Sequence, residues 1–81
     1  MKLYQYKAKY LKRLILYQPR TSREKELKDL LIAKLETLRT PTMPYFLRTL
    51  HEVLAHENVS EEFKAIVRSM IEEAPVEGEE E

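Results

Sequence analysis

Four runs of apolar residues, each repeating at the three- and four-residue spacing of an α-helix, constrain the fold of this chain most strongly. The runs cover residues 2–17, residues 21–39, the stretch from Pro44 to a turn at residues 57–60, and the stretch from Ser60 to about residue 73. No segment alternates apolar and polar residues over a useful length, as a strand would. The pattern predicts an all-α fold, a compact antiparallel bundle of four short amphipathic helices.

Capping residues and prolines set the expected helix boundaries. Thr21 and Glu24 have the spacing of a capping box, with Thr21 as the N-cap of the second helix. Ser60 is the expected N-cap of the fourth helix. Pro44 suits the first turn of the third helix, where its missing N–H costs nothing, and Pro19 ends the first helix.

On a helical wheel, the first run divides into an apolar arc and a basic side. The arc, which we expect to be buried, consists of Leu3, Tyr4, Ala8, Tyr10, Leu11, Leu14, Ile15 and Tyr17. The opposite side consists of Lys2, Gln5, Lys9, Lys12 and Arg13. Leu16 falls on this basic side, so we expect it to be exposed and able to anchor a docked partner.

A chain of 81 residues forms one domain at most, with a thin core. We assign residues 1–73 to a single helical bundle domain. Residues 74–81, APVEGEEE, have no apolar periodicity and are predicted to form a flexible, disordered acidic tail.

The net charge of zero conceals a strong asymmetry between the two halves of the chain. Residues 1–39 carry eleven Lys or Arg against four acids, whereas residues 40–81 carry three against ten, so the halves have charges of +7 and −7. Such asymmetry indicates an anionic partner for the basic half. An interpretation of equal weight is that the halves neutralise each other within the fold or between two copies.

Several kinds of chemistry are excluded or disfavoured. The chain has no cysteine, and its one glycine, Gly78, lies in the tail, so thiol chemistry and a glycine-rich phosphate loop are absent. The stretch HEVLAH places His51 and His56 five residues apart, whereas a zinc-protease helix needs a spacing of four. On an intact helix these side chains would diverge by about 140°. We therefore predict no catalytic residues, no metal and no cofactor, and expect that the protein is not an enzyme.

The N-terminal stretch is charged throughout and lacks the uninterrupted apolar core of a signal peptide. This predicts a soluble, cytoplasmic protein without a membrane partner. The chain has one Asn and two Gln while 35% of its residues are charged, a composition typical of heat-adapted proteins.

The stretch from residue 2 to residue 28 carries nine basic residues and four tyrosines, and it is the basis of the functional hypothesis. The expected contacts are Lys2, Lys9, Lys12, Arg13, Leu16, Arg20 and Arg23. We expect a non-enzymatic accessory or adaptor subunit that docks through its first helix onto a larger partner, part of a nucleic-acid-processing machine such as a polymerase or replication complex.

Three alternatives remain open. The same residues could bind DNA or RNA directly, through backbone charge pairing and tyrosine stacking. The acidic C-terminal half could mimic nucleic acid, as in a phage- or virus-type inhibitor. Finally, the protein could form a homodimer.

Overall fold

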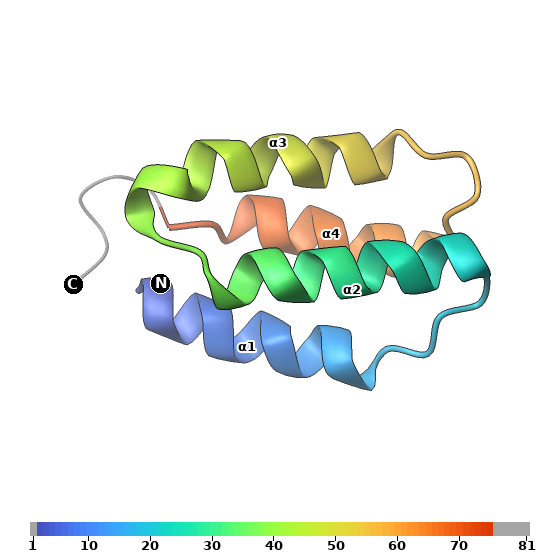
Figure 1. The fold of residues 1–81 in the computed structure, drawn as a ribbon, viewed down its shortest axis with the longest axis horizontal. Coiled ribbons are helices and arrows are strands. Elements are labelled where there is room, and N and C mark those ends of the chain that lie inside the picture. The colour runs from blue at the N-terminus through green and yellow to red at the C-terminus, as the bar shows by residue number, and fades with distance from the viewer. Residues whose placement is uncertain (1, 76–81) are drawn as a thin grey trace.

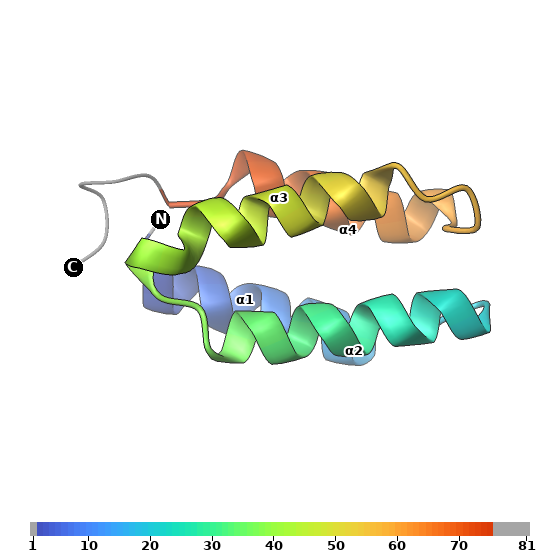
Figure 2. The same ribbon diagram turned by 45° about the horizontal axis from the view of Figure 1, so that its top comes forward.

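The computed structural model describes residues 2–75, and within them the chain forms four α-helices. These are α1 (Leu3–Leu16), α2 (Ser22–Glu36), α3 (Met43–Leu54) and α4 (Glu61–Glu72), with a short 3-10 turn, η1 (Thr40–Thr42), before α3. Helices α1 and α2 form one antiparallel hairpin, α3 and α4 form another, and the two hairpins stack as two layers (Figures 1 and 2). The radius of gyration is 12.0 Å, close to the value of about 12 Å expected for a folded chain of this length. The predicted all-α, compact fold is confirmed.

The expected N-caps are confirmed at two helices. The Thr21 hydroxyl accepts a hydrogen bond from the Glu24 N–H at 3.1 Å, and the Ser60 hydroxyl accepts one from the Phe63 N–H at 3.3 Å. Pro44 lies in the first turn of α3, as expected. These boundaries depend only on local chemistry, because a cap satisfies N–H groups of its own first turn.

Helix α2 ends earlier than the apolar pattern indicates, at Glu36 instead of Arg39. The Thr37 hydroxyl donates to the carbonyls of Ala33 and Lys34, both at 3.3 Å, in the last turn of the helix. Leu38 lies beyond the helix but remains buried in the core. The connection to α3 therefore turns away from the α2 axis while its apolar side chain still packs.

The buried arc predicted for α1 is wrong by a rotation of about 60° around the helix axis. Tyr6, outside the predicted arc, is fully buried with Tyr10 and Leu14, whereas Tyr4, Ala8 and Ile15 are exposed. The Tyr6 hydroxyl donates to the Met70 carbonyl of α4 at 2.6 Å, and the Tyr6 and Tyr10 rings are 5.1 Å apart. The hydroxyl of a buried tyrosine needs a hydrogen-bond acceptor, and the Met70 carbonyl reaches Tyr6 because α1 and α4 pack together in the fold.

The structure describes two residues of the segment that we assigned to an acidic tail. Ala74 packs against the core and Pro75 is buried. The rest of that segment, residues 76–81, lies outside the described residues, as does Met1. The division of the chain at residue 73 stays a prediction.

Candidate partner-binding surface on helix α1

The rotation of α1 places apolar side chains on its solvent side. We define the α1 outer face as Tyr4, Ala8, Lys12, Ile15 and Leu16, all of which are exposed. The exposed fractions are 61% for Tyr4, 59% for Ile15 and 66% for Leu16. Among the described residues the other exposed large apolar side chains are Tyr45, at 63%, and Leu30, at 42%. The exposed apolar surface is therefore concentrated on one helix.

Lys9, one of the predicted contact residues, is engaged within the fold. Its ammonium lies 2.7 Å from a carboxylate oxygen of Glu73, directly after α4, and the Tyr10 hydroxyl donates to the same oxygen at 2.7 Å. The hydrogen bonds from Lys9 and Tyr10 lower the pKa of Glu73. Burial and the bond to Glu73 raise the pKa of Tyr10 to about 12. This cluster joins α1 to the end of α4, so Lys9 contributes to the layer contact.

Arg20 and Arg23 are also paired with carboxylates. The Arg20 guanidinium, in the connection after α1, lies 2.5 Å from Glu62 in the first turn of α4. Arg23 pairs with Glu26 one turn along α2, at 3.2 Å. Both pairs are solvent-exposed, and exposed pairs contribute at most about 1 kcal/mol. A partner could displace them at small cost, but neither residue lies on α1 itself.

The remaining predicted residues occupy different places along α1. Lys12 is exposed and forms no ion pair within residues 2–75. The Arg13 guanidinium lies 5.6 Å from the centre of the Tyr10 ring, within the range of a cation–π contact. Lys2 is the N-cap residue at the opposite end, about 20 Å along the axis from Leu16. The structure thus brings together Lys9, Lys12, Arg13 and Leu16, and separates Lys2, Arg20 and Arg23 from them.

A buried carboxylate, Glu24, fixes the chain directly after this surface. Its side chain is 1% exposed. One carboxylate oxygen accepts from the Tyr17 hydroxyl at 2.7 Å and from the Arg20 N–H at 2.9 Å, and the other accepts from the Ser60 N–H at 2.5 Å. The sequence predicts Glu24 as a capping-box residue bonded to its own N-cap, whereas the carboxylate instead joins three segments of the fold.

The charge of Glu24 is stabilised by these donors. Burial alone would raise its pKa, but the N–H groups of Arg20 and Ser60 and the hydroxyls of Tyr17 and Ser60 outweigh burial and lower the pKa of Glu24 to about 2. The Tyr17 hydroxyl also lies 2.8 Å from the Ser60 hydroxyl, and the Tyr17 ring packs 5.2 Å from Phe63. The network ties the C-terminal end of α1 to the start of α4.

The two histidines of the HEVLAH stretch lie in different elements. His51 is exposed on α3, whereas α3 ends at Leu54 and His56 lies in the following turn, half-buried. The angle of 140° expected on an intact helix therefore does not apply. Within the described part of the chain, no three His, Asp or Glu side chains come together as metal ligands. None of the helices within residues 2–75 has the length and apolar character needed to cross a bilayer.

Comparison with known proteins gives no relative for this chain. No family model, no curated protein and no solved structure matches it.

Proposed function

We propose that this protein is a non-enzymatic accessory or adaptor subunit that docks through the α1 outer face onto a larger protein. The partner would belong to a nucleic-acid-processing machine, such as a polymerase or replication complex. The observation that carries the proposal is the exposure of Leu16 and Ile15 at the C-terminal end of α1, beside Lys12.

Exposed leucine and isoleucine side chains are favourable anchors for a docked protein. Full burial of either side chain contributes roughly 1.5–3 kcal/mol relative to full exposure. Both residues are about three-fifths exposed, so most of this contribution is still to be gained by docking. The Glu24 network holds the chain directly after these residues, so docking has to order mainly their side chains. Apolar residues on an ordered helix support a protein interface.

The charges around the anchors indicate the electrostatic character of the partner. Lys12 and Arg13 precede Leu16 by about one turn, and neither forms an ion pair within residues 2–75. An acidic rim on the partner would complement them and would mainly accelerate association. Direct binding of a phosphate backbone by the predicted residues would have to displace Lys9, Arg20 and Arg23 from carboxylates of the chain itself, whereas docking through Leu16 and Ile15 displaces no ion pair.

A pull-down from native lysate tests this function. The wild type, Leu16→Asp and Leu30→Asp would serve as bait, each with and without nuclease treatment. Leu30 is a matched control because it is an exposed leucine on α2. We expect Leu16→Asp to lose a partner that the wild type and Leu30→Asp retain, and we expect nuclease to have no effect.

Two outcomes would contradict the proposal. Equal recovery by all three baits would show that the α1 outer face is not the docking surface. Loss of the partner after nuclease treatment, together with a steep decrease in binding as salt rises, would indicate that the chain binds nucleic acid directly.

A further inference from the structure

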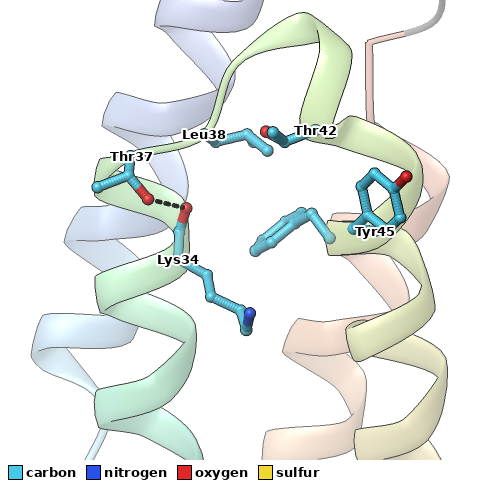
Figure 3. A pocket seen from close by; sticks show the side chains of 6 residues that line it. Lys34, Thr37, Leu38, Thr42 and Tyr45 are labelled. Atoms are coloured by element: carbon cyan, nitrogen blue, oxygen red, sulfur yellow. Dashed lines mark hydrogen bonds between the residues drawn. The ribbon is translucent and has the colours of Figure 1, made fainter.

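A hollow lies between the C-terminal end of α2 and the first turns of α3, away from the α1 outer face (Figure 3). It encloses about 240 Å³ and is lined by Lys34, Thr37, Leu38, Thr42, Tyr45 and Phe46. Sites for drug-sized ligands usually have volumes of about 300–1,000 Å³. The size of this hollow is therefore closer to that of one bulky side chain.

The walls of the hollow are apolar where they are deepest. Leu38 and Phe46 belong to the buried core and form its floor. Tyr45, on α3, is 63% exposed, so its ring forms a wall with one side open to an incoming group. Such a site favours an apolar or aromatic side chain, because insertion removes apolar surface of both molecules from water.

The two threonine hydroxyls of the hollow are already hydrogen-bonded within the chain. The Thr37 hydroxyl donates to the carbonyls of Ala33 and Lys34, and the Thr42 hydroxyl donates to the Arg39 carbonyl and accepts from the Arg39 N–H, both at 3.0 Å. Neither hydroxyl keeps a proton to donate to a ligand. For the edge of a nucleobase, the lining side chains then offer only the Lys34 ammonium and the Tyr45 hydroxyl as donors, so these walls suit a hydrocarbon side chain better than a base.

Three basic residues that form no ion pair among residues 2–75 lie in the segments that line the hollow. The Lys34 side chain extends into the space between α2 and α3 (Figure 3). The Arg48 guanidinium lies 5.8 Å from the centre of the Tyr45 ring, and Arg39 lies in the connection between Leu38 and Thr42. None of the three forms an ion pair among residues 2–75, whereas six other basic residues do. A ligand that carries negative charge would complement these cations.

From these observations we propose that the hollow binds an acidic peptide segment of a protein partner. The segment inserts one bulky apolar side chain over Leu38 and Phe46 and places flanking carboxylates against Lys34 and Arg48. This site shares no residue with the α1 outer face, so it gives the chain a second, independent interaction surface. An adaptor that joins two proteins needs two such surfaces.

The test uses the full chain labelled with ¹⁵N and three blocked pentapeptides. The first has a central tryptophan with two glutamates on each side, the second replaces the glutamates by lysines, and the third replaces the tryptophan by alanine. We expect only the first peptide to shift the amide signals of Lys34, Thr37 and Tyr45 in a saturable way. Loss of binding with the second and third peptides would show that both the charge and the apolar side chain are required.

A charge-reversal variant and a matched control locate the binding site. Lys34→Glu should weaken binding of the first peptide by about tenfold or more, because it replaces an attractive contact by a repulsive one. Lys25→Glu makes the same change of charge about 13 Å away along the α2 axis, and should change the affinity by less than about twofold. Lys25 is exposed, and within residues 2–75 its one ion pair is with Asp29, so the control should fold normally.

Three results would overturn the proposal. The first is the absence of saturable shifts at the hollow, or shifts confined to α1. The second is equal binding of the lysine peptide. The third is a shift of the Lys34, Thr37 and Tyr45 signals on deletion of residues 76–81 with no peptide present, which would assign the hollow to the C-terminal segment of the chain itself. None of these results bears on the pull-down with Leu16→Asp.

Discussion

Replacement of Glu24 by glutamine should destabilise the fold strongly at neutral pH. The carboxylate accepts hydrogen bonds from Tyr17, Arg20 and Ser60, and it is almost completely buried. A glutamine amide has one acceptor oxygen and an NH₂ group, so one of its two ends would place a donor against another donor. The mismatch leaves one N–H, of either Arg20 or Ser60, without an acceptor, at a cost of about 1–3 kcal/mol.

The pKa of Glu24 gives a second measure of the same contribution. Its pKa is lowered from 4.5 to about 2, which corresponds to about 3 kcal/mol of stabilisation of the folded state when the carboxylate is ionised. Because the folded pKa is the lower one, this stabilisation is complete above the unfolded pKa and disappears as the pH falls from about 4.5 to about 2. At pH 3, about 1.4 kcal/mol of it should remain.

Urea unfolding of the wild type and Glu24→Gln, followed by circular dichroism at several pH values, measures this effect. We expect the difference in the free energy of unfolding to be about 3 kcal/mol at pH 7 and less than half of that at pH 3. The other carboxylates titrate in both proteins, so their contributions cancel in the difference. Glu57→Gln, a change in the exposed turn before α4, should stay within about 0.5 kcal/mol of the wild type.

Two outcomes would refute the reasoning on Glu24. If Glu24→Gln lost less than about 1 kcal/mol at pH 7, the network would not stabilise the fold as the geometry implies. If the difference between the two proteins were equally large at pH 7 and pH 3, the loss would arise from altered packing, and ionisation of Glu24 would not contribute.

Two further predictions concern the orientation of α1. Leu14→Ala should lower the free energy of unfolding by about 2–5 kcal/mol, because Leu14 is fully buried. Leu16→Ala should change it by less than about 0.5 kcal/mol, because Leu16 is exposed. Equal losses for the two variants in urea unfolding would contradict the orientation of α1 in the structure. Tyr6→Phe should lower the free energy of unfolding by about 1–3 kcal/mol, because it leaves the buried Met70 carbonyl without its hydrogen-bond donor. An unchanged free energy of unfolding in the same assay would mean that water replaces the hydroxyl.

The parts of the fold that could be predicted from the sequence depend on neighbours along the chain. The caps at Thr21 and Ser60 bond to N–H groups three residues away, so their residue types suffice to predict them. The spacing of apolar residues likewise predicts the number and type of the helices, because burying one face of each requires only a periodic pattern.

The orientation of α1 could not be predicted in this way, because tyrosine is both apolar and polar. Tyr4 and Tyr6 are equally suited to a buried position by residue type, and the wheel includes Tyr4 in the apolar arc. Which tyrosine is buried depends on the Met70 carbonyl, which lies 64 residues away along the chain and accepts a hydrogen bond from the Tyr6 hydroxyl. No local pattern contains that contact.

The two candidate surfaces also differ in whether the sequence can predict them. One depends on a local pattern, and the other depends on the tertiary fold. Exposure of Leu16 follows from its place among basic residues on a helical wheel, and the structure agrees. The hollow between α2 and α3 instead depends on how the connection of residues 37–42 leaves the α2 axis. Its six lining residues come from two helices and a turn, and no spacing in the sequence marks them as neighbours.

The opposite charges of the two halves of the chain can now be assigned to specific contacts. Two ion pairs, Lys9 with Glu73 and Arg20 with Glu62, join the basic α1–α2 layer to the acidic α3–α4 layer. Part of the asymmetry is therefore neutralised within the fold, as one of the two initial interpretations held. Lys12 on α1 and Lys34 near the α2–α3 connection remain without ion pairs in the described residues. Because unpaired charges beside exposed apolar side chains are the ones that an external partner can complement, the search for partners should begin with these two positions.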